Sequence, residues 1–301
     1  APGGVMRIFV TGGSGQIGRA VVAELLSGGH QLTALVHRSL VPGRGVRQLR
    51  GSLARLAPLA HEIAAAEAIV HLASPRTNLR SRALEEDIAG TGALLDAWNG
   101  GRFIFASSQT LYGVVRGEVA EDAPRSAECW YDIAKLVNES QIAMAAAERA
   151  GAVGASLRIP LVLGHALGSE GQILDILADA LLEGRVFHFQ SEAERAADGS
   201  VFIGPRDLAR GIALALTIEE SGAYNLAGGF FTWREALEGL AAGLERAPEI
   251  AVRAGPSRSG EFPLWRSACR YDVSRFTRAT GFQPRESAAE LIAAYCERPR
   301  R

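Results

Sequence analysis

Tyr131 and Lys135 are the residues whose types and spacing most directly suggest chemistry. Lys135 is the only lysine in the 301-residue chain, although arginine occurs throughout. On a helix, side chains four positions apart share one face, so a phenol and an ammonium can address the same point in space. A fixed positive charge nearby favours phenolate and makes a tyrosine a usable proton shuttle near neutral pH. The alternative is an ordinary amphipathic helix, because Y-x-x-x-K alone is a weak pattern.

A serine is expected beside this pair. The segment SSQTLYG, Ser107 to Gly113, follows an apolar run and precedes the helix that bears Tyr131 and Lys135. In an open α/β sheet, ligands bind outside the carboxyl ends of the strands. Ser108 and Tyr131 are therefore predicted to emerge on the same side of the sheet, where three chemically suitable groups meet.

A glycine-rich turn near the N-terminus has the context of a dinucleotide site. The apolar run that ends at Val10 leads directly into TGGSGQIG, Thr11 to Gly18, and a segment with helical spacing follows. Gly12 allows a tight turn, Gly15 lets a pyrophosphate approach backbone N–H groups, and Gly18 lets the helix pack on the sheet. A turn without a ligand is the less favoured interpretation.

The end of the second strand, Gln31 to Val36, bears on the choice of coenzyme. NAD-binding units usually place an acid here for the ribose hydroxyls, whereas this chain has His37 and Arg38. Arg38, helped by Arg44 or Arg47, could bind the 2′-phosphate of NADP through charge-assisted hydrogen bonds. NADP is therefore favoured over NAD, and a solvated loop is the alternative.

The remainder of the first half predicts further βα units and hence an α/β fold with a doubly wound parallel sheet. After a third strand at VRQLRG, the expected elements are a helix over Leu53–Ala65, a strand over Ala68–Ser74, a helix over Arg82–Trp98, a strand over Arg102–Ser108, a helix over Tyr131–Ala150 and a strand over Gly154–Gly164.

Beyond about residue 165 the alternation loosens, which indicates a smaller mixed lobe that selects the substrate. Residues 1–165, with part of 200–228, are predicted to form the dinucleotide-binding domain, and 166–301 mainly the substrate lobe. The expected elements are a helix over Gly171–Leu182, a strand over Val186–Phe189, a polar loop over Ser191–Gly199, a helix over Arg206–Thr217, the segment AYNLAG and a helix in FTWREALEGLAAGL.

The composition excludes several classes of function. Apolar residues make up 48% and charged residues 22% of the chain, and the net charge is −1, so neither a nucleic-acid surface nor a membrane face is indicated. Cys129, Cys269 and Cys296 are widely spaced and lack a C-x-x-C pattern, which argues against disulfides and zinc. No metal-ligand spacing is present, and His71 is expected to be structural. With no signal peptide or membrane span recognised, a cytoplasmic enzyme is expected.

Taken together, these motifs resemble the extended short-chain dehydrogenases/reductases, the NAD-dependent epimerase/dehydratase group. The resemblance covers nearly the whole chain and implies a Rossmann domain, a small substrate domain and a bound nicotinamide dinucleotide. It also implies that Ser108 holds the substrate oxygen, that Tyr131 exchanges its proton and that Lys135 binds the nicotinamide ribose and favours the tyrosine phenolate. The matching segments are T-G-x-x-G-x-x-G at Thr11–Gly18, HLAS at His71–Ser74, IAGT at Ile88–Thr91, SSQTLYG, YDIAK, RDLA at Arg206–Ala209, YNLAG at Tyr224–Gly228 and GFQP at Gly281–Pro284.

The resemblance also implies a coenzyme site spread over several strand ends. Its expected residues are Thr11, Gly12, Gly15, Gln16, Ile17, Gly18, His37, Arg38, Ser52, Leu53, Leu72, Ala73, Ser74, Tyr131, Lys135, Ile159 and Pro160.

Departures from the family pattern reduce the number of activities that the resemblance implies. Gln109 and Thr110 replace the Asp-Glu pair that sugar-nucleotide 4,6-dehydratases of this family use for water elimination. Leu161 and Ser200 stand where the epimerases carry an Asn and an Arg that contact the substrate diphosphate. Asp87 replaces an Asn that helps to shape the backbone beside the active site.

The function that these observations favour is an NADPH-using ketoreductase or alcohol dehydrogenase on a small organic substrate. A nucleotide-sugar 4-epimerase or 4-ketoreductase is the closest alternative, and a non-catalytic dinucleotide-binding protein is a third. A homodimer is also expected, because the helices over Arg82–Trp98 and Tyr131–Ala150 are rich in apolar residues and the equivalent pair in related proteins forms a four-helix interface.

Overall fold

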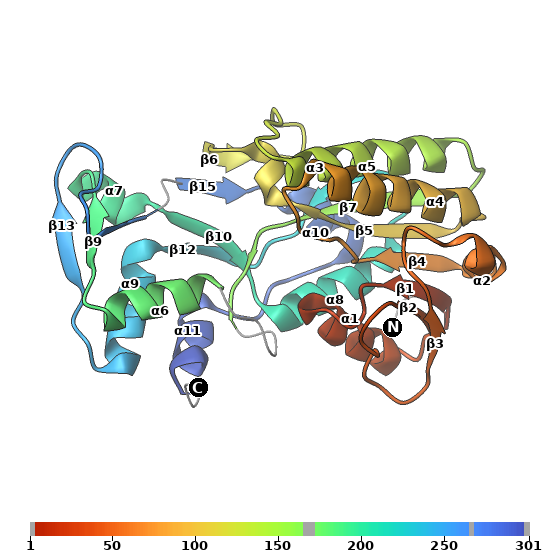
Figure 1. The fold of residues 1–301 in the computed structure, drawn as a ribbon, viewed down its shortest axis with the longest axis horizontal. Coiled ribbons are helices and arrows are strands. Elements are labelled where there is room, and N and C mark those ends of the chain that lie inside the picture. The colour runs from red at the N-terminus through yellow and green to blue at the C-terminus, as the bar shows by residue number, and fades with distance from the viewer. Residues whose placement is uncertain (1–3, 165–171, 265–267, 298–301) are drawn as a thin grey trace.

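A computed structural model describes residues 4–164, 172–264 and 268–297. The chain forms a large lobe around a seven-stranded sheet and a smaller lobe of short sheets and helices, which lie side by side (Figure 1). The chain passes between the lobes more than once, because β10 lies in the small lobe and β11, which follows it in sequence, lies in the large one.

The large sheet is parallel throughout and has the order β11-β7-β5-β4-β1-β2-β3. The chain builds outward from β1 in one direction and then returns to build from β4 in the other, which is the doubly wound arrangement predicted from the sequence. The strands are β1 (Arg7–Thr11), β2 (Gln31–Val36), β3 (Val46–Arg50), β4 (Ala68–His71), β5 (Arg102–Ser108), β7 (Val153–Ile159) and β11 (Gly222–Asn225).

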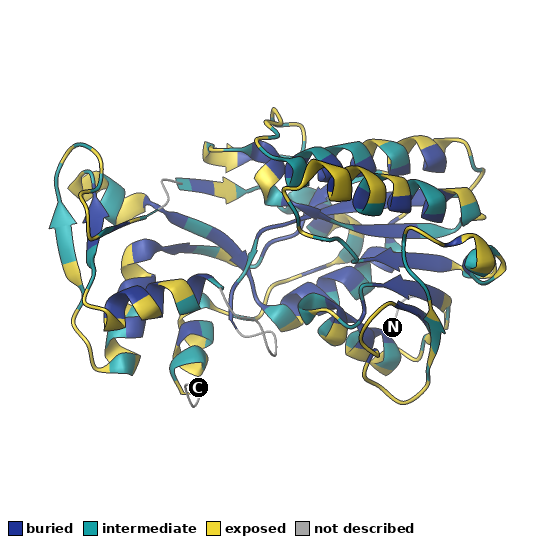
Figure 2. Cartoon of the chain, in the orientation of Figure 1, coloured by how far each residue is buried: buried dark blue, intermediate teal, exposed yellow. Residues whose placement is uncertain are grey.

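Helices cover both faces of this sheet. Apolar residues of α1 (Gln16–Ser27) and α8 (Pro205–Leu214) pack on one face, and those of α2 (Ala60–Ala64), α4 (Ala89–Ala97) and α5 (Trp130–Ala147) pack on the other. The central strands are buried on both sides (Figure 2), which explains why they appear in the sequence as continuous apolar runs rather than alternating ones. Two short elements, α10 (Ser274–Thr280) and the 3-10 helix Ala215–Thr217, pack beside β11 and α8.

The small lobe has its own apolar core. One short sheet has the order β12-β10-β8 and another has the order β13-β9-β14, while β15 pairs with β6 near the large lobe. Its strands are β6 (Arg116–Val119), β8 (Leu161–Val162), β9 (Val186–Phe189), β10 (Gly199–Ile203), β12 (Gly229–Thr232), β13 (Glu249–Val252), β14 (Glu261–Pro263) and β15 (Ala268–Tyr271). Its helices are α6 (Ile173–Leu182), α7 (Glu192–Ala197), α9 (Trp233–Leu244) and α11 (Ala288–Cys296).

Two of the predicted elements have a different secondary structure from the one expected. The expected single strand over Gly154–Gly164 is divided at Pro160, after which Leu161 and Val162 join a different sheet. Proline has no N–H to donate to a ladder, so β7 ends before it. The expected loop over Ser191–Gly199 contains α7, whose first amides are capped because the Ser191 side chain accepts from the Glu194 N–H.

Other elements differ in their bounds. Within the expected helix over Leu53–Ala65, the helical residues are the 3-10 turn Ala57–Leu59 and α2. The expected helix over Arg82–Trp98 is composite, with α3 (Arg80–Arg82), a π-helical segment over Ala83–Ile88 and then α4. The helix expected from Gly171 begins at Ile173, and Gly171 itself lies outside the described residues.

Candidate active site

The strand order reverses between β1 and β4, and Thr11 and His71 are the last residues of these two strands. The Thr91 hydroxyl donates to the Asp87 carbonyl at 2.7 Å, so it accepts from Nε2 of His71 at 3.0 Å. Nδ1 of His71 therefore accepts from the Thr11 hydroxyl at 2.6 Å. Burial, and secondarily the charge of Lys135, lower the pKa of His71 to about 3. His71 is therefore a buried bridge between Thr11 and Thr91, held in its neutral form.

The glycine turn has the geometry of a cradle for a diphosphate. Gly12 has φ +72°, and a Cβ there would lie 2.6 Å from the Ala73 nitrogen. A Cβ on Gly18 would lie 2.1 Å from the Gly12 carbonyl oxygen, so α1 packs against the turn only because this residue is glycine. Gly15 caps α1 in an extended conformation, and no side chain of the described residues caps this end. The first-turn N–H groups are therefore free to meet an anion, which fits a dinucleotide.

Lys135 and Tyr131 lie together at the carboxyl end of β5. Lys135 is 3% exposed, and its ammonium donates to the Ala106 carbonyl at 2.9 Å. The same nitrogen lies 4.6 Å from the ring centroid of Phe105 and 5.5 Å from that of the half-buried Tyr131. The structure therefore places the predicted cation next to the predicted phenol and fixes it to the strand that ends in Ser108.

Ser108 is the last residue of β5 and is buried. Its hydroxyl accepts from the Thr110 N–H at 3.2 Å and lies 2.9 Å from the Thr110 hydroxyl, so it caps the 3-10 helix Gln109–Tyr112. Both bonds are local, and among the described residues no hydrogen bond joins Ser108 to Tyr131. The serine is thus oriented by its own turn rather than by the tyrosine.

Asp87, which the sequence singled out as a departure, is a buried link between the loop after β4 and α5. It lies in the π-helical segment, a form that is rare and often found at functional sites. Its carboxylate accepts from the Ser74 hydroxyl at 2.6 Å and from Asn138 Nδ2 at 2.9 Å. Ser74 follows β4, and Asn138 is one turn beyond Lys135, so the loop after β4 is attached to the helix that bears Tyr131 and Lys135.

At the predicted adenosine end, His37 and Arg38 are exposed directly after β2. Ser52 follows β3 and forms an isolated bridge with Arg55. Arg47, which was expected to assist Arg38, instead pairs with Glu62 through two short bonds of 2.6 and 2.5 Å. Arg38 and Arg44 are both exposed, and no ion pair within the described residues engages either of them.

The remaining predicted coenzyme residues lie at the ends of the same parallel strands or beside them. Leu72 and Ala73 follow β4 and donate to the carbonyl and hydroxyl of Thr11, at 3.1 and 3.3 Å. Ile159 ends β7 opposite Ser108, and Pro160 follows it. Gln16, Ile17 and Leu53 complete the set. Gln16 accepts from Gln172, the N-cap residue of α6, at 3.2 Å, Ile17 packs on the core, and Leu53 lies against Gly90.

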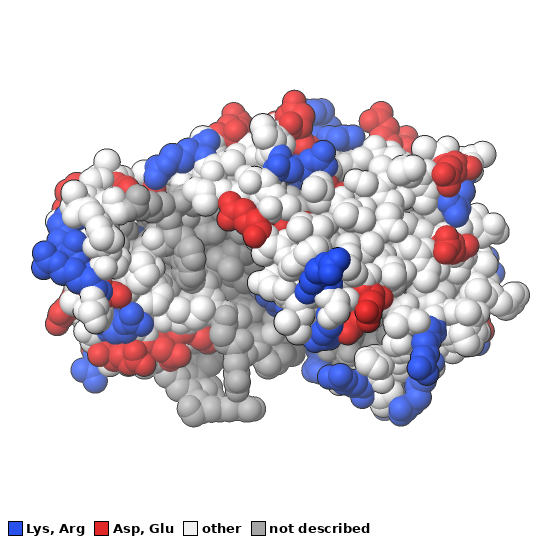
Figure 3. Space-filling view, turned by 45° about the horizontal axis from the view of Figure 1, so that its top comes forward, with Lys and Arg blue, Asp and Glu red and all other residues white. Residues whose placement is uncertain are grey.

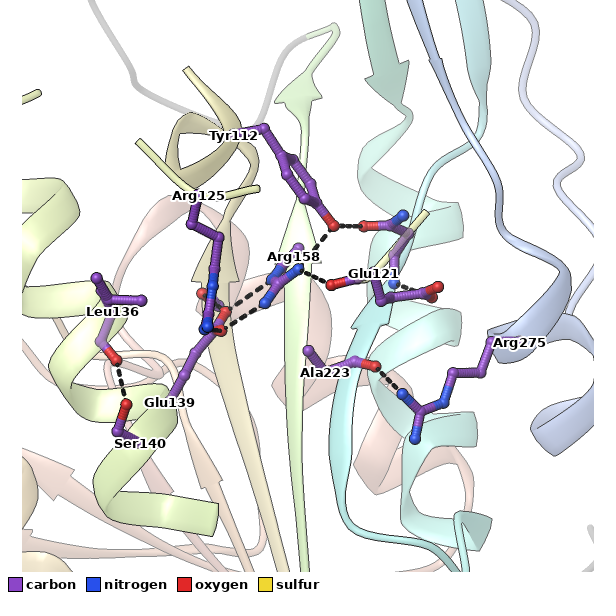
Figure 4. A network of polar contacts seen from close by, with 11 residues as sticks. Tyr112, Glu121, Arg125, Leu136, Glu139, Ser140, Arg158, Ala223 and Arg275 are labelled. Atoms are coloured by element: carbon purple, nitrogen blue, oxygen red, sulfur yellow. Dashed lines mark hydrogen bonds and ion pairs between the residues drawn. The ribbon is translucent and has the colours of Figure 1, made fainter. Parts of the chain in front are cut away.

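Sequence reasoning missed a buried polar network beside the predicted catalytic residues (Figure 4). Arg158 of β7 donates to both carboxylate oxygens of Glu139, from Nε at 3.1 Å and from Nη2 at 2.8 Å. It also donates to the Tyr112 hydroxyl at 2.8 Å, and that hydroxyl donates to Asn225 Oδ1 at 2.6 Å. The one signal available in the sequence was the position of Glu139, four residues after Lys135.

Other features of the described residues bear on function. No group of His, Cys, Asp or Glu residues there could hold a metal ion, and no helix there is long and apolar enough to cross a bilayer. Basic and acidic side chains are interspersed over the face shown in Figure 3.

Cavities of about 400 and 730 Å³ lie in the small lobe, and neither is lined by Ser108, Tyr131 or Lys135.

A doubly wound parallel sheet with a glycine turn at its switch point defines a dinucleotide-binding α/β protein of the Rossmann type. The sequence matches the NAD dependent epimerase/dehydratase family over residues 8–227, and the chain belongs to this family. The family consists of NAD-dependent epimerases and dehydratases, which are enzymes of the oxidoreductase type.

Individual relatives include an epimerase and a reductase. The chain is 31% identical over 130 residues to a UDP-glucose 4-epimerase of Klebsiella pneumoniae, covering 36% of this chain and 93% of that protein. It is 28% identical over 195 residues to a 2-alkyl-3-oxoalkanoate reductase of Stenotrophomonas maltophilia (strain K279a), covering 60% of this chain and 57% of that protein.

Solved structures show the same architecture. MoeE5 in complex with UDP-glucuronic acid and NAD has a TM-score of 0.77 and 25% identity, covering 97% of this chain and 98% of that one. UDP-glucose 4-epimerase from Thermotoga maritima, with UDP-glucose, also has a TM-score of 0.77 over the same shares of the two chains, at 22% identity. The second similarity concerns the fold alone.

Proposed function

We propose that the chain is a nicotinamide-dependent ketoreductase or alcohol dehydrogenase that acts on a small organic carbonyl or alcohol. The observation that carries this proposal is the position of Lys135, which is buried against β5, 5.5 Å from the ring centroid of Tyr131, on the strand that ends in Ser108. A buried cation beside a half-buried phenol is the arrangement that proton transfer to or from a substrate oxygen requires.

The side chains take separate roles in carbonyl reduction. The Ser108 hydroxyl donates a hydrogen bond to the carbonyl oxygen and holds it in place. The Tyr131 phenol gives its proton to that oxygen as negative charge develops there, and the Lys135 ammonium stabilises the phenolate that remains. The nicotinamide supplies the hydride when it is bound. Alcohol oxidation uses the same groups in reverse, with Tyr131 phenolate accepting the proton.

NADP is the proposed coenzyme preference within a family defined by NAD. Support comes from the absence of an acid at the end of β2, where His37 and Arg38 are both exposed. A guanidinium there can bind a 2′-phosphate through charge-assisted hydrogen bonds, whereas neither position carries the carboxylate that usually accepts from the ribose hydroxyls of NAD.

A nucleotide-sugar 4-epimerase or 4-ketoreductase is the second candidate, and the similarity to UDP-glucose 4-epimerase and to MoeE5 supports it. Two positions weigh against it. Leu161 has no polar group for a diphosphate, and the Ser200 hydroxyl donates to the Val201 carbonyl at 3.0 Å. The small-molecule carbonyl substrate is therefore placed first.

The test compares the wild-type protein with Tyr131→Phe. Oxidation of NADPH and NADH is followed against a panel of ketones, aldehydes and oxoacids, and the variant is expected to lose about 10²- to 10⁴-fold in kcat while coenzyme affinity stays within about twofold. Equal rates for the two proteins would defeat the proposal. Interconversion of UDP-glucose and UDP-galactose without net coenzyme oxidation, with NAD retained through purification, would establish the second candidate instead.

A further inference from the structure

Glu139 is a buried carboxylate for which the proposed reaction has no use. It lies on α5 four residues after Lys135 and eight after Tyr131, so the three side chains share the helix face that covers the sheet. Its exposed fraction is 7%, and a charge at that depth requires close partners. The identity of those partners indicates a structural role for the carboxylate.

The two hydrogen-bonding partners of Glu139 come from β5, which ends in Ser108, and from β7 beside it, while the exposed Arg125 of the loop before α5 lies 3.8 Å from Oε2. The Ser107 hydroxyl donates to Oε1 at 2.6 Å, and Arg158 binds both oxygens (Figure 4). Ser107 directly precedes Ser108 on β5, and Arg158 is its register partner on β7. Two side chains that lie opposite each other in the sheet therefore hold one helix carboxylate.

Arg158 is itself fully engaged. Besides Glu139 and Tyr112, it donates from Nη1 to the Glu121 carbonyl at 2.7 Å, so each guanidinium nitrogen has a partner. Burial opposes the charged form, but the hydrogen bonds and charge of Glu139 raise the pKa of Arg158 above its ordinary value. The guanidinium is thus a permanently charged and immobile partner for the carboxylate.

Two polar ties consequently attach successive turns of α5 to successive residues of β5. Lys135 donates to the Ala106 carbonyl, and Glu139 accepts from Ser107. Apolar packing between a helix and a sheet is non-directional and does not by itself fix how far the helix slides or turns. With a single hydrogen bond to β5, α5 could still rotate about that contact. Two such bonds one helical turn apart fix the position of α5 along the strand.

We propose that Glu139 is a positioning residue that, through Ser107 and Arg158, fixes the turn of α5 carrying Lys135 against the end of β5. Lys135 then meets the coenzyme, and Tyr131 faces the substrate oxygen beside Ser108. This inference rests on the proposed function for the role of Lys135. The inference adds that Lys135 contributes to coenzyme binding only while the hydrogen bond between Ser107 and Glu139 is intact.

A double-mutant cycle between Ser107 and Lys135, with the dissociation constant of the coenzyme as the measured quantity, tests this proposal. Ser107→Ala removes the tie to β5 but keeps the ion pair, and it is expected to raise the dissociation constant for NADPH or NADH about three- to tenfold. Lys135→Ala is expected to raise it about tenfold or more. If Ser107 acts through Lys135, the double variant binds within about twofold of Lys135→Ala, whereas independent effects multiply and would overturn the proposal.

Two further variants separate positioning from folding. Glu139→Gln removes the charge and is expected to show the same non-additivity with Lys135→Ala. Arg149→Gln is the matched control, because Arg149 ties the far end of α5 to the carbonyls of Leu95 and Trp98. It is expected to lower the thermal midpoint and leave the coenzyme dissociation constant unchanged. A control that weakens binding as much as Ser107→Ala would mean that loss of helix anchoring alone explains the effect.

Because the double-mutant cycle is measured in coenzyme binding, its failure can be told apart from failure of the proposed function. If the wild-type protein binds coenzyme but reduces no carbonyl, the proposed function is wrong, and the cycle can still be measured. If the protein reduces carbonyls but the Ser107→Ala and Lys135→Ala effects on the dissociation constant multiply, this inference alone is wrong. A wild-type protein that binds neither NADPH nor NADH overturns both.

Discussion

The hydroxyl of Thr11 donates to Nδ1 of His71 at 2.6 Å, across the point where the strand order of the sheet reverses. Thr91 accepts from the other ring nitrogen, and the Thr11 oxygen also accepts from the Ala73 N–H. The imidazole therefore joins the start of the glycine turn, the loop after β4 and α4. A protonated ring would need a second acceptor in place of the Thr11 hydroxyl proton, so this bridge requires neutral histidine.

The first prediction concerns the pH dependence of stability. The folded pKa of His71 is about 3, against an ordinary value of 6.5, so between these values the unfolded chain binds a proton that the folded chain does not. This contribution is fully present above pH 6.5 and is lost as the pH falls toward 3. From pH 7 to pH 5 it should lower the free energy of unfolding by about 2 kcal/mol.

Urea unfolding at the two pH values checks this. His71→Gln should be less stable at pH 7 but should lose about 2 kcal/mol less than the wild-type protein between pH 7 and pH 5. His61→Gln, at an exposed position on α2, should keep the wild-type dependence. A His71→Gln protein with the full wild-type loss would show that this residue does not couple protonation to folding.

The second prediction concerns the choice of lysine. Lys135 points one ammonium at one carbonyl and lies 4.6 Å from the ring centroid of Phe105, in a space that a planar guanidinium cannot fill without displacement. Lys135→Arg should reduce kcat about 10²-fold or more, because the Tyr131 phenolate loses the cation positioned to stabilise it, and cost about 1–3 kcal/mol of stability from overpacking. Steady-state kinetics and urea unfolding measure the two effects.

Its matched control exchanges a cation elsewhere on the same strand. Arg102→Lys, at the start of β5, should leave kcat unchanged, because Arg102 donates to the Leu216 carbonyl far from the strand's carboxyl end. Wild-type turnover by Lys135→Arg would show that any cation serves at that position.

The third prediction separates two glycines of the turn. A Cβ on Gly18 would meet backbone that cannot move away, at 2.1 Å from the Gly12 oxygen and 2.7 Å from the Gly13 Cα. Gly18→Ala should therefore cost about 2–3 kcal/mol of stability. A Cβ on Gly15 would lie 3.2 Å from the Gly12 oxygen, so Gly15→Ala should fold and lose mainly coenzyme affinity.

Urea unfolding and coenzyme titration distinguish these outcomes. Gly4→Ala is the control, since nothing lies within 4 Å of a Cβ there. Equal stability loss for the Gly15 and Gly18 variants would contradict the assignment of separate packing and binding roles.

The sequence was most informative where a pattern is local. The strands Gln31–Val36, Arg102–Ser108 and Val186–Phe189 occur with the predicted bounds, because each is a mainly apolar segment of strand length. Within Ser191–Gly199 the abundance of charged residues obscured an S-x-x-E cap that starts a helix. Beyond Ile159, the apolar character of Leu161 and Val162 could not reveal that they pair in another sheet.

The candidate site divides in the same way. The glycine turn and the Tyr131–Lys135 spacing are local signals, and the structure brings that tyrosine and lysine together. The partnership of Glu139 with Ser107 and Arg158 joins residues 32 and 19 positions apart, so it depends on how α5 packs on the sheet. Hydrophobic periodicity carries no information about such a pair.

The fourth prediction concerns coenzyme preference. Arg38→Ala should raise the dissociation constant for NADPH about tenfold or more, because charge-assisted bonds to the 2′-phosphate are lost, and change that for NADH by less than about twofold. Arg7→Ala is the control, since Arg7 begins β1 at the amino end of the parallel strands, away from the carboxyl end of β2 that Arg38 follows, and pairs with Glu67. Equal losses for both coenzymes in Arg38→Ala would remove the NADP assignment.

The fifth prediction concerns association. Helices α4 and α5 lie side by side on the outer face of the large lobe (Figure 1), and Met144 of α5 is 66% exposed. Leu84, in the π-helical segment that leads into α4, is 37% exposed. Light scattering at micromolar concentration should give twice the mass of one chain, since a second copy of this helix pair covers these apolar side chains.

Met144→Arg should shift that mass to one chain, because a guanidinium buried without a partner in such an interface is costly to desolvate. Leu182→Arg provides the control: Leu182 is 45% exposed at the end of α6 in the small lobe, and its substitution should leave the dimer intact. A monomeric wild-type protein would contradict the prediction outright. A Met144→Arg protein that stays dimeric would show that the interface does not bury Met144, because an unpaired guanidinium buried at that position would weaken association.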